Sequence, residues 1–130
     1  MIEFYLDGES GVSAYRQIAR QVRHALTLGM LNRGDQLPTV KEAVAQLAVN
    51  PNTVLKAYRE LERDGLVEAR PGVGTFVSAS ISTATIAAHA PLRRELQRWL
   101  RSARAAGLDD ASVEALLLTT FHNEASEGVA

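Results

Sequence analysis

Residues 39–54, TVKEAVAQLAVNPNTV, contain two helix start signals, and this stretch decides the fold. Thr39 and Glu42 match the capping box, in which each side chain satisfies a free backbone N–H at the start of a helix. Asn50 is a favourable N-cap residue, and Pro51 follows at the first helical position, where no backbone donor is needed. The apolar spacing of the first of these helices stops after about two turns, so only a tight connection separates it from the second. Two helices joined this closely predict a helix-turn-helix.

Another helix is predicted upstream, from about Ser13 to Leu28, and Gly29 is placed to end it. Apolar residues recur in it at the spacing of one buried helical stripe. The expected buried residues are Tyr15, Ile18, Ala19, Val22, Ala25 and Leu26 in this helix and Val54, Ala57, Tyr58 and Leu61 in the helix that opens at Asn50. The polar residues Arg16, Gln17, Arg20, Arg23 and His24 are expected on the exposed faces.

The apolar period changes to that of β-strands after Gly65. The segments 66–70 and 75–77 flank Pro-Gly-Val-Gly at 71–74, which predicts a β-hairpin. A short extended stretch is also expected at Gln36-Leu37, just before Pro38. Three helices followed by a hairpin predict a winged helix-turn-helix over Val12 to Val77. The fold class is therefore mainly α with a small β-hairpin (α+β).

The last third of the chain predicts two further helices. Residues 79–90 are rich in Ser, Thr and Ala and are expected to form a linker, with the winged helix in 1–78 and a helical dimerisation arm in 91–130. One helix is expected from about Leu92 to Ala106, and the other follows an N-cap at Asp109. Two helices are too few to cover their own apolar sides, so we infer a homodimer. The dimerisation residues are predicted to be Leu92, Leu96, Trp99, Leu100, Leu116, Leu117 and Phe121.

Composition narrows the function classes. The chain has no cysteine, so it has neither disulfides nor thiolate zinc sites. It has no apolar run long enough to cross a bilayer and no secretory signal, so we expect a cytoplasmic location. The net charge is only -1. Between Val12 and Tyr58, however, the chain has six Lys or Arg residues and only two Asp or Glu residues. A local basic face of this kind suits a site-specific DNA-binding protein.

Polar residues at the start of the second helix of the pair are candidates for reading DNA. Asn50, Asn52, Thr53 and Lys56 occupy its opening turns, where amide, hydroxyl and ammonium groups can bind base edges or phosphates in the major groove. Asn50 and Thr53 are also ordinary capping residues, and either role or both can hold. Lys41 could contact a base or the backbone, or simply be solvated. Similarly, Gly72 and Gly74 could let the hairpin approach the minor groove, or could serve only the turn.

Six motifs in sequence order cover about half the chain. They are Tyr15-Arg16-Gln17-Ile18, Gly34-Asp35-Gln36-Leu37-Pro38-Thr39, Val49-Asn50-Pro51-Asn52-Thr53-Val54, Tyr58 with Leu61, Asp64-Gly65-Leu66-Val67 and Gly72-Val73-Gly74-Thr75-Phe76-Val77. On these motifs the chain resembles the GntR family of bacterial transcriptional regulators. The Asn-Pro-Asn-Thr segment and the short tail are most similar to the YtrA subfamily, whose members carry a small two-helix dimerisation arm.

The resemblance implies a dimeric regulator, usually a repressor, that binds a palindromic operator, often near its own gene or a transporter operon. It places Lys41 at a base-reading position that is more usually Arg, and residues 72–74 at the tip of the wing. Two departures are Pro51, where many members carry a base-reading Arg, and Val73, where the wing often has a basic residue. The minor-groove contact is then expected either to be weaker or to come from Arg70.

Two other classes of function compete with this interpretation. Catalysis is disfavoured because the three histidines lie on separate elements and no nucleophile, acid pair or metal-ligand spacing is evident, and no cofactor is implied. The stronger alternative is a winged helix that binds proteins instead of DNA. Such a module should expose apolar anchors where this chain has polar residues, with Leu55 the one large apolar residue in that turn. Whether a small effector exists stays open.

Overall fold

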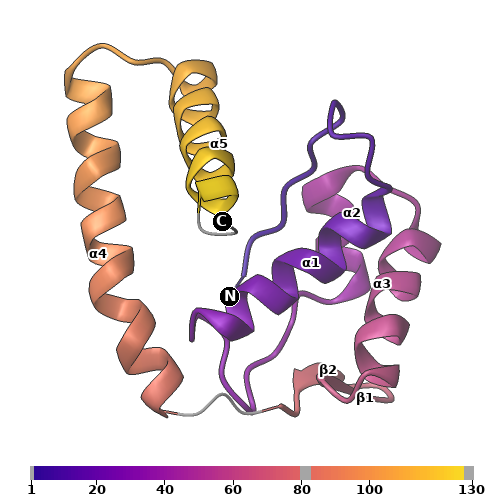
Figure 1. Ribbon diagram of the computed structural model, residues 1–130. Helices are drawn as coiled ribbons and strands as arrows, with labels where there is room; N and C mark the ends of the chain where they lie inside the picture. The colour runs from indigo at the N-terminus through magenta and orange to yellow at the C-terminus, as the bar shows by residue number, and fades with distance from the viewer. Residues whose placement is uncertain (1, 80–82, 128–130) are drawn as a thin grey trace. The chain divides into compact units, whose positions relative to one another are not determined.

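The computed structural model describes residues 2–79 and 83–127. By its internal packing the chain divides into two units, residues 1–87 and 88–130. Figure 1 shows the elements. They are, in order, α1 (Ala14–Thr27), α2 (Val40–Leu47), α3 (Pro51–Arg63), β1 (Val67–Arg70), β2 (Gly74–Val77), α4 (Thr83–Ala105) and α5 (Asp110–Glu127).

Both helices of the pair begin at the predicted residues, with the predicted capping hydrogen bonds. The Thr39 hydroxyl accepts a hydrogen bond from the Glu42 N–H and the Glu42 carboxylate accepts one from the Thr39 N–H, each at 3.1 Å. Asn50 Oδ1 accepts the Asn52 N–H at 2.8 Å. Between the helices, Ala48 has φ +53°, the one positive φ of a non-glycine residue in the described part of the chain. This left-handed residue ends α2 and produces the tight turn of the helix-turn-helix.

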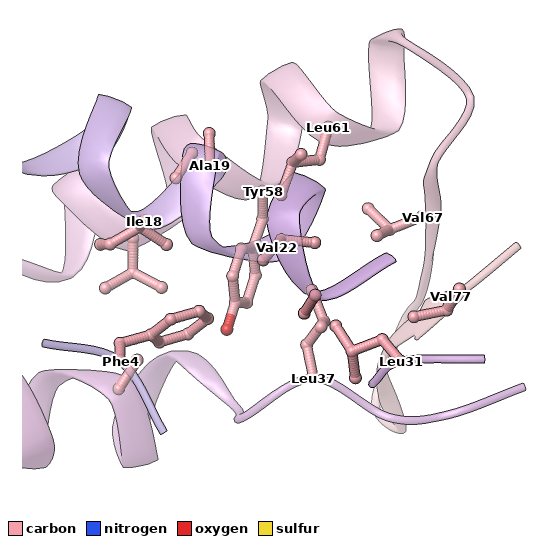
Figure 2. Packing of buried hydrophobic residues seen from close by; sticks show 14 of the residues in the cluster. Phe4, Ile18, Ala19, Val22, Leu31, Leu37, Tyr58, Leu61, Val67 and Val77 are labelled. Carbon is pink, nitrogen blue, oxygen red and sulfur yellow. The ribbon is translucent and has the colours of Figure 1, made fainter. Parts of the chain in front are cut away.

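The core of residues 1–87 lies between α1, α3 and the segment that enters α2 (Figure 2). Ile18 and Val22 of α1, Leu61 of α3 and Leu37 before α2 are fully buried. Each such side chain contributes about 1.5–3 kcal/mol of transfer free energy. The helical stripes predicted from the sequence therefore face one another, and this packing fixes the position of α3.

The N-terminal arm, residues 2–12, is part of this core. The Phe4 ring is 6% exposed and lies 6.4 Å from the ring of Tyr58, centroid to centroid. Gln17, predicted on an exposed face, is instead buried, because its amide accepts the Asp7 N–H at 2.8 Å and donates to the Asp7 carbonyl at 3.0 Å. One turn later, Gln21 binds the backbone of the arm in the same way. Both amides satisfy backbone N–H and C=O groups of the arm, and these hydrogen bonds compensate the burial of the Gln17 side chain.

The hairpin has an additional strand-like neighbour. β1 pairs antiparallel with β2, with Val67 opposite Val77. On the other edge of β2, the Leu37 N–H donates to the Thr75 carbonyl at 2.9 Å, as expected for an extended stretch there. Gly74 has φ +146°, and a Cβ at this position would lie 2.5 Å from Nε2 of Gln36. The positive φ therefore favours glycine where the wing meets this segment, and any larger residue would also displace the Gln36 side chain.

The last two helices differ from the prediction in length. α4 is already helical at Thr83, whereas the sequence predicted a linker over 79–90 and a helix only from Leu92. Pro91 lies inside α4, and the alanine-rich residues before it continue the helix across the proline. α5 runs back against the direction of α4 (Figure 1) and continues to Glu127. Within the described ranges, no helix has both the length and the apolar character needed to cross a membrane.

Candidate nucleic-acid interface

The outer face of α3 carries a row of polar and cationic side chains. Asn52, Lys56, Arg59 and Arg63 follow one another at intervals of four, three and four residues, so they share a face of the helix. All four are exposed. Together with Tyr15 and Glu60 they line an open groove of about 410 Å³. Three positive charges and one carboxamide along one helix face suit the major groove and its flanking phosphates.

The start of α3 combines capping with exposure. The side-chain oxygen of Asn50 accepts the hydrogen bond of the helix cap, and the residue is exposed. Asn52, two residues further on, is exposed as well, whereas Thr53 is half-buried. Lys41 lies in the first turn of α2 and is also exposed. Each predicted residue of the helix pair is therefore accessible, though Asn50 has a structural role of its own.

The Lys56 side chain lies over an aromatic ring. Its Nζ is 4.1 Å from the centroid of the Tyr15 ring in α1. The neighbouring Arg16 donates a hydrogen bond from Nε to Tyr15 Oη at 3.2 Å. Two cations from different helices thus meet at one tyrosine, on the wall of the groove.

The wing presents Arg70 beside its tip. The guanidinium lies 4.3 Å from the centroid of the Phe76 ring on the opposite strand, close enough for a cation–π interaction. Gly72, in the turn, is exposed, whereas Gly74 is half-buried against Gln36. The two glycines that the sequence singled out therefore differ: one lies at the tip and the other at the junction of the wing with the core.

Several basic residues do not behave as their sequence positions indicated. Arg23, counted with the basic face of α1, forms an ion pair with Asp64 at the end of α3. Conversely, Arg59 and Arg63 line the α3 groove and were missed. Their spacing from Asn52 along the predicted helix was the signal that could have found them.

The described part of the unit 88–130 exposes much of its apolar surface. Ala103 and Val113 are buried where α4 and α5 approach their connection. Phe121 is 69% exposed, and Leu118, which was not among the predicted dimerisation residues, is 51% exposed. The predicted dimerisation residues comprise the exposed Leu92, Leu96, Leu116, Leu117 and Phe121 and the half-buried Trp99 and Leu100.

Three helices, a wing and a polar outer face on α3 define the winged helix-turn-helix class of DNA-binding transcriptional regulators. The family model described as "Bacterial regulatory proteins, gntR family" matches residues 14–77. The chain is 35% identical to the HTH-type transcriptional repressor YtrA of Bacillus subtilis (strain 168) over 105 residues, 80% of this chain and 81% of that protein. The chain therefore belongs to the GntR family, and it is a regulator, not an enzyme.

Solved structures agree with this assignment. YtrA from Sulfolobus acidocaldarius, a GntR-family transcription factor, is 29% identical with a TM-score of 0.56, covering 80% of this chain and 99% of that one. The DNA-binding domain of AraR in complex with operator ORX1 is 26% identical with a TM-score of 0.52, covering 59% of this chain and 96% of that one. The similarity to both YtrA proteins covers more residues than the winged helix contains, so it includes part of the C-terminal helices and identifies the YtrA type.

Proposed function

We propose that this regulator represses transcription by binding a palindromic operator as a homodimer. The observation that carries the proposal is the exposed row of Asn52, Lys56, Arg59 and Arg63 on the outer face of α3. Carboxamide and guanidinium groups bind base edges and phosphates in the major groove. Lys41 at the start of α2 and Arg70 beside the wing tip are further exposed cations that could contact DNA.

The homodimer is supported by the apolar residues of the C-terminal arm, residues 91–130. Leu92, Leu96, Leu116 and Phe121 are between 45% and 69% exposed, and a soluble monomer rarely leaves so much large apolar surface together. α5 also carries apolar residues around most of its circumference, a pattern typical of a helix covered on more than one side. A second copy would supply the cover. Its two-fold symmetry would make the operator a palindrome with half-sites about one helical turn of DNA apart.

The proposals of repression and of the target genes rest on the similarity to related proteins. The B. subtilis relative is named a transcriptional repressor. The resemblance to the family favours a target near the protein's own gene or a transporter operon, and a location in the cytoplasm with the DNA. Binding to a protein in place of DNA is disfavoured because the outer face of α3 offers cations where an interaction module needs apolar anchors. Leu55, the candidate anchor, is half-buried in a hollow between α3, the start of α2 and the hairpin.

Fluorescence anisotropy tests the proposal, with the full chain, labelled DNA from upstream of its own gene, excess random-sequence competitor and two salt concentrations. We expect tight binding that resists the competitor and weakens as salt rises, because phosphate contacts release counterions. If the protein binds a sequence selected from a random library but not the DNA upstream of its own gene, operator binding would remain supported and autoregulation would be excluded. No binding to either DNA would refute the proposal and favour the protein-binding alternative.

A further inference from the structure

Tyr15 brings two cations from two helices to one place on the groove. It lies in the first turn of α1, half-buried, with its ring packed against the core on one side. Lys56 Nζ of α3 is 4.1 Å from the ring centroid. Arg16 of α1 donates from Nε to Tyr15 Oη at 3.2 Å, and its Cζ is 5.9 Å from the same centroid.

This arrangement is unfavourable for the cations alone. Two like charges that share one ring repel each other, and Lys and Arg side chains each lose about 2 kcal/mol of rotamer entropy when they are held in place. The electron-rich face of the ring attracts the Lys56 ammonium, and the phenol oxygen accepts a hydrogen bond from Arg16. Both interactions offset the repulsion between the two charges. Glu60, which lines the same groove, adds a favourable charge nearby. The tyrosine therefore holds the two cations together.

We propose that Tyr15 is a positioning residue that presents Lys56 and Arg16 as a pair to the DNA phosphate backbone beside the major groove. The inference rests on the proposed function. Phosphate is the expected ligand because both groups are exposed cations held at Tyr15 of α1, and cations bind phosphate oxygens whatever the sequence. With the side chains already ordered, less entropy is lost when DNA binds. Lys56, for which the sequence left base and phosphate contacts open, is assigned to phosphate.

A double-mutant cycle tests this assignment in the full chain. We would measure Kd by anisotropy on the selected operator and on random DNA over a series of salt concentrations. Lys56→Ala should weaken binding to both DNAs equally and lower the salt slope by about one. Tyr15→Leu should also weaken binding to both, by about two- to fivefold, and this loss should shrink in the Lys56→Ala background. Tyr15→Phe keeps the ring, so it should retain the coupling to Lys56.

Tyr5→Leu is the matched control. Tyr5 is 68% exposed on the N-terminal arm, and its contacts with Gln21 use backbone atoms, so binding should not change. Since Tyr15 also packs against the core, thermal unfolding would establish that each variant is folded at the assay temperature. If Tyr15→Leu does not fold, a cycle of Tyr15→Phe with Arg16→Ala carries the test, because the phenol oxygen should couple only to Arg16.

The outcomes separate this inference from the proposed function. Non-additive losses on both DNAs support it. Additive losses in a cycle whose variants all fold would overturn the assignment of Tyr15, and so would wild-type affinity for Tyr15→Leu. In either case, operator binding by the wild-type protein would still support the proposed function. A loss confined to the operator would also overturn it, because phosphate contacts are independent of sequence. Failure of the wild-type protein to bind any DNA would refute the proposed function itself.

Discussion

The Tyr58 hydroxyl donates a 2.6 Å hydrogen bond to the carbonyl oxygen of Pro38. Tyr58 lies in the middle of α3, and Pro38 directly precedes the N-cap residue of α2. The bond therefore joins the two helices of the helix-turn-helix across the core, and both residues are buried. It helps to set the angle at which the exposed face of α3 is presented beside Lys41.

Tyr58→Phe should lower the free energy of unfolding by about 1–3 kcal/mol, because it leaves the buried Pro38 carbonyl without its partner. Urea unfolding followed by circular dichroism measures this change. Tyr5→Phe removes a hydroxyl from an exposed tyrosine and should change stability by less than about 0.5 kcal/mol. Equal effects of the two substitutions would show that the 2.6 Å bond contributes no net stability.

Alkaline pH should destabilise the fold through the same residue. Burial, with a smaller contribution from the nearby Glu42 carboxylate, raises the pKa of Tyr58. The unfolded chain releases this phenolic proton near pH 10 and the folded chain retains it, so this contribution is complete below about pH 10 and is lost as the pH rises further. Unfolding measured from pH 8 to 11 should therefore show a steeper loss of stability for the wild-type protein than for Tyr58→Phe. Parallel curves would contradict the prediction.

Asn50 can be separated into its two roles by the choice of substituent. Asn50→Ala removes the cap and should lower the unfolding free energy by about 1 kcal/mol. Asn50→Ser keeps a capping oxygen but removes the amide nitrogen, so stability should stay close to that of the wild-type protein. If the amide reads a base, Asn50→Ser should weaken operator binding at unchanged stability. Wild-type operator affinity in this variant would leave Asn50 as a cap alone.

Asn52→Ala should weaken operator binding by about 1–3 kcal/mol and hardly affect binding to random DNA, because a carboxamide contact to a base edge depends on sequence. Competition anisotropy on both DNAs gives the two values. Asn32→Ala, at an exposed asparagine before α2, is the matched control and should leave both unchanged. Equal losses on the two DNAs would remove Asn52 from base reading.

Trp99→Ala should loosen the dimer, because truncation of a large aromatic side chain that becomes buried costs about 3–5 kcal/mol. Trp99 is half-buried within its own chain, which leaves part of the ring for a second copy to cover. Sedimentation equilibrium at micromolar concentration measures the change. Arg94→Ala, at an exposed position on another face of α4, should leave the dimer intact. An unchanged mass for Trp99→Ala would exclude this residue from the interface.

The sequence predicted those features that depend on neighbours in the chain. The Thr39–Glu42 capping box, the Asn50-Pro51 start and the hairpin around Gly72 each involve a few consecutive residues, and each is observed. Interactions between distant residues were not accessible in the same way. Nothing local to Gln17 indicates that its amide binds the backbone of the N-terminal arm.

The same distinction applies to the candidate site. Asn52 and Lys56 could be assigned to the start of α3 from its signals, and the structure finds both exposed there. The position of Lys56 over Tyr15 depends on how α1 crosses α3, which no local pattern specifies. The early start of α4 was missed for another reason: residues 79–90 were assigned to a linker because they are rich in Ser, Thr and Ala, although alanine is also the best helix former.

The N-terminal arm determines the shortest segment of this protein that could be fused to another domain in a chimera. A chimera joined at Ala14, where the family similarity begins, would lack Phe4 and leave a hole beside Tyr58. The loss of a buried phenylalanine costs about 3–5 kcal/mol, a large part of the stability of a small domain. Gln17 and Gln21 would also lose the backbone partners that permit their positions. The smallest unit for engineering is therefore longer than residues 14–77, which the family model matches, and exchanges of effector or dimerisation modules are expected to keep residues 2–12 attached to the helix-turn-helix.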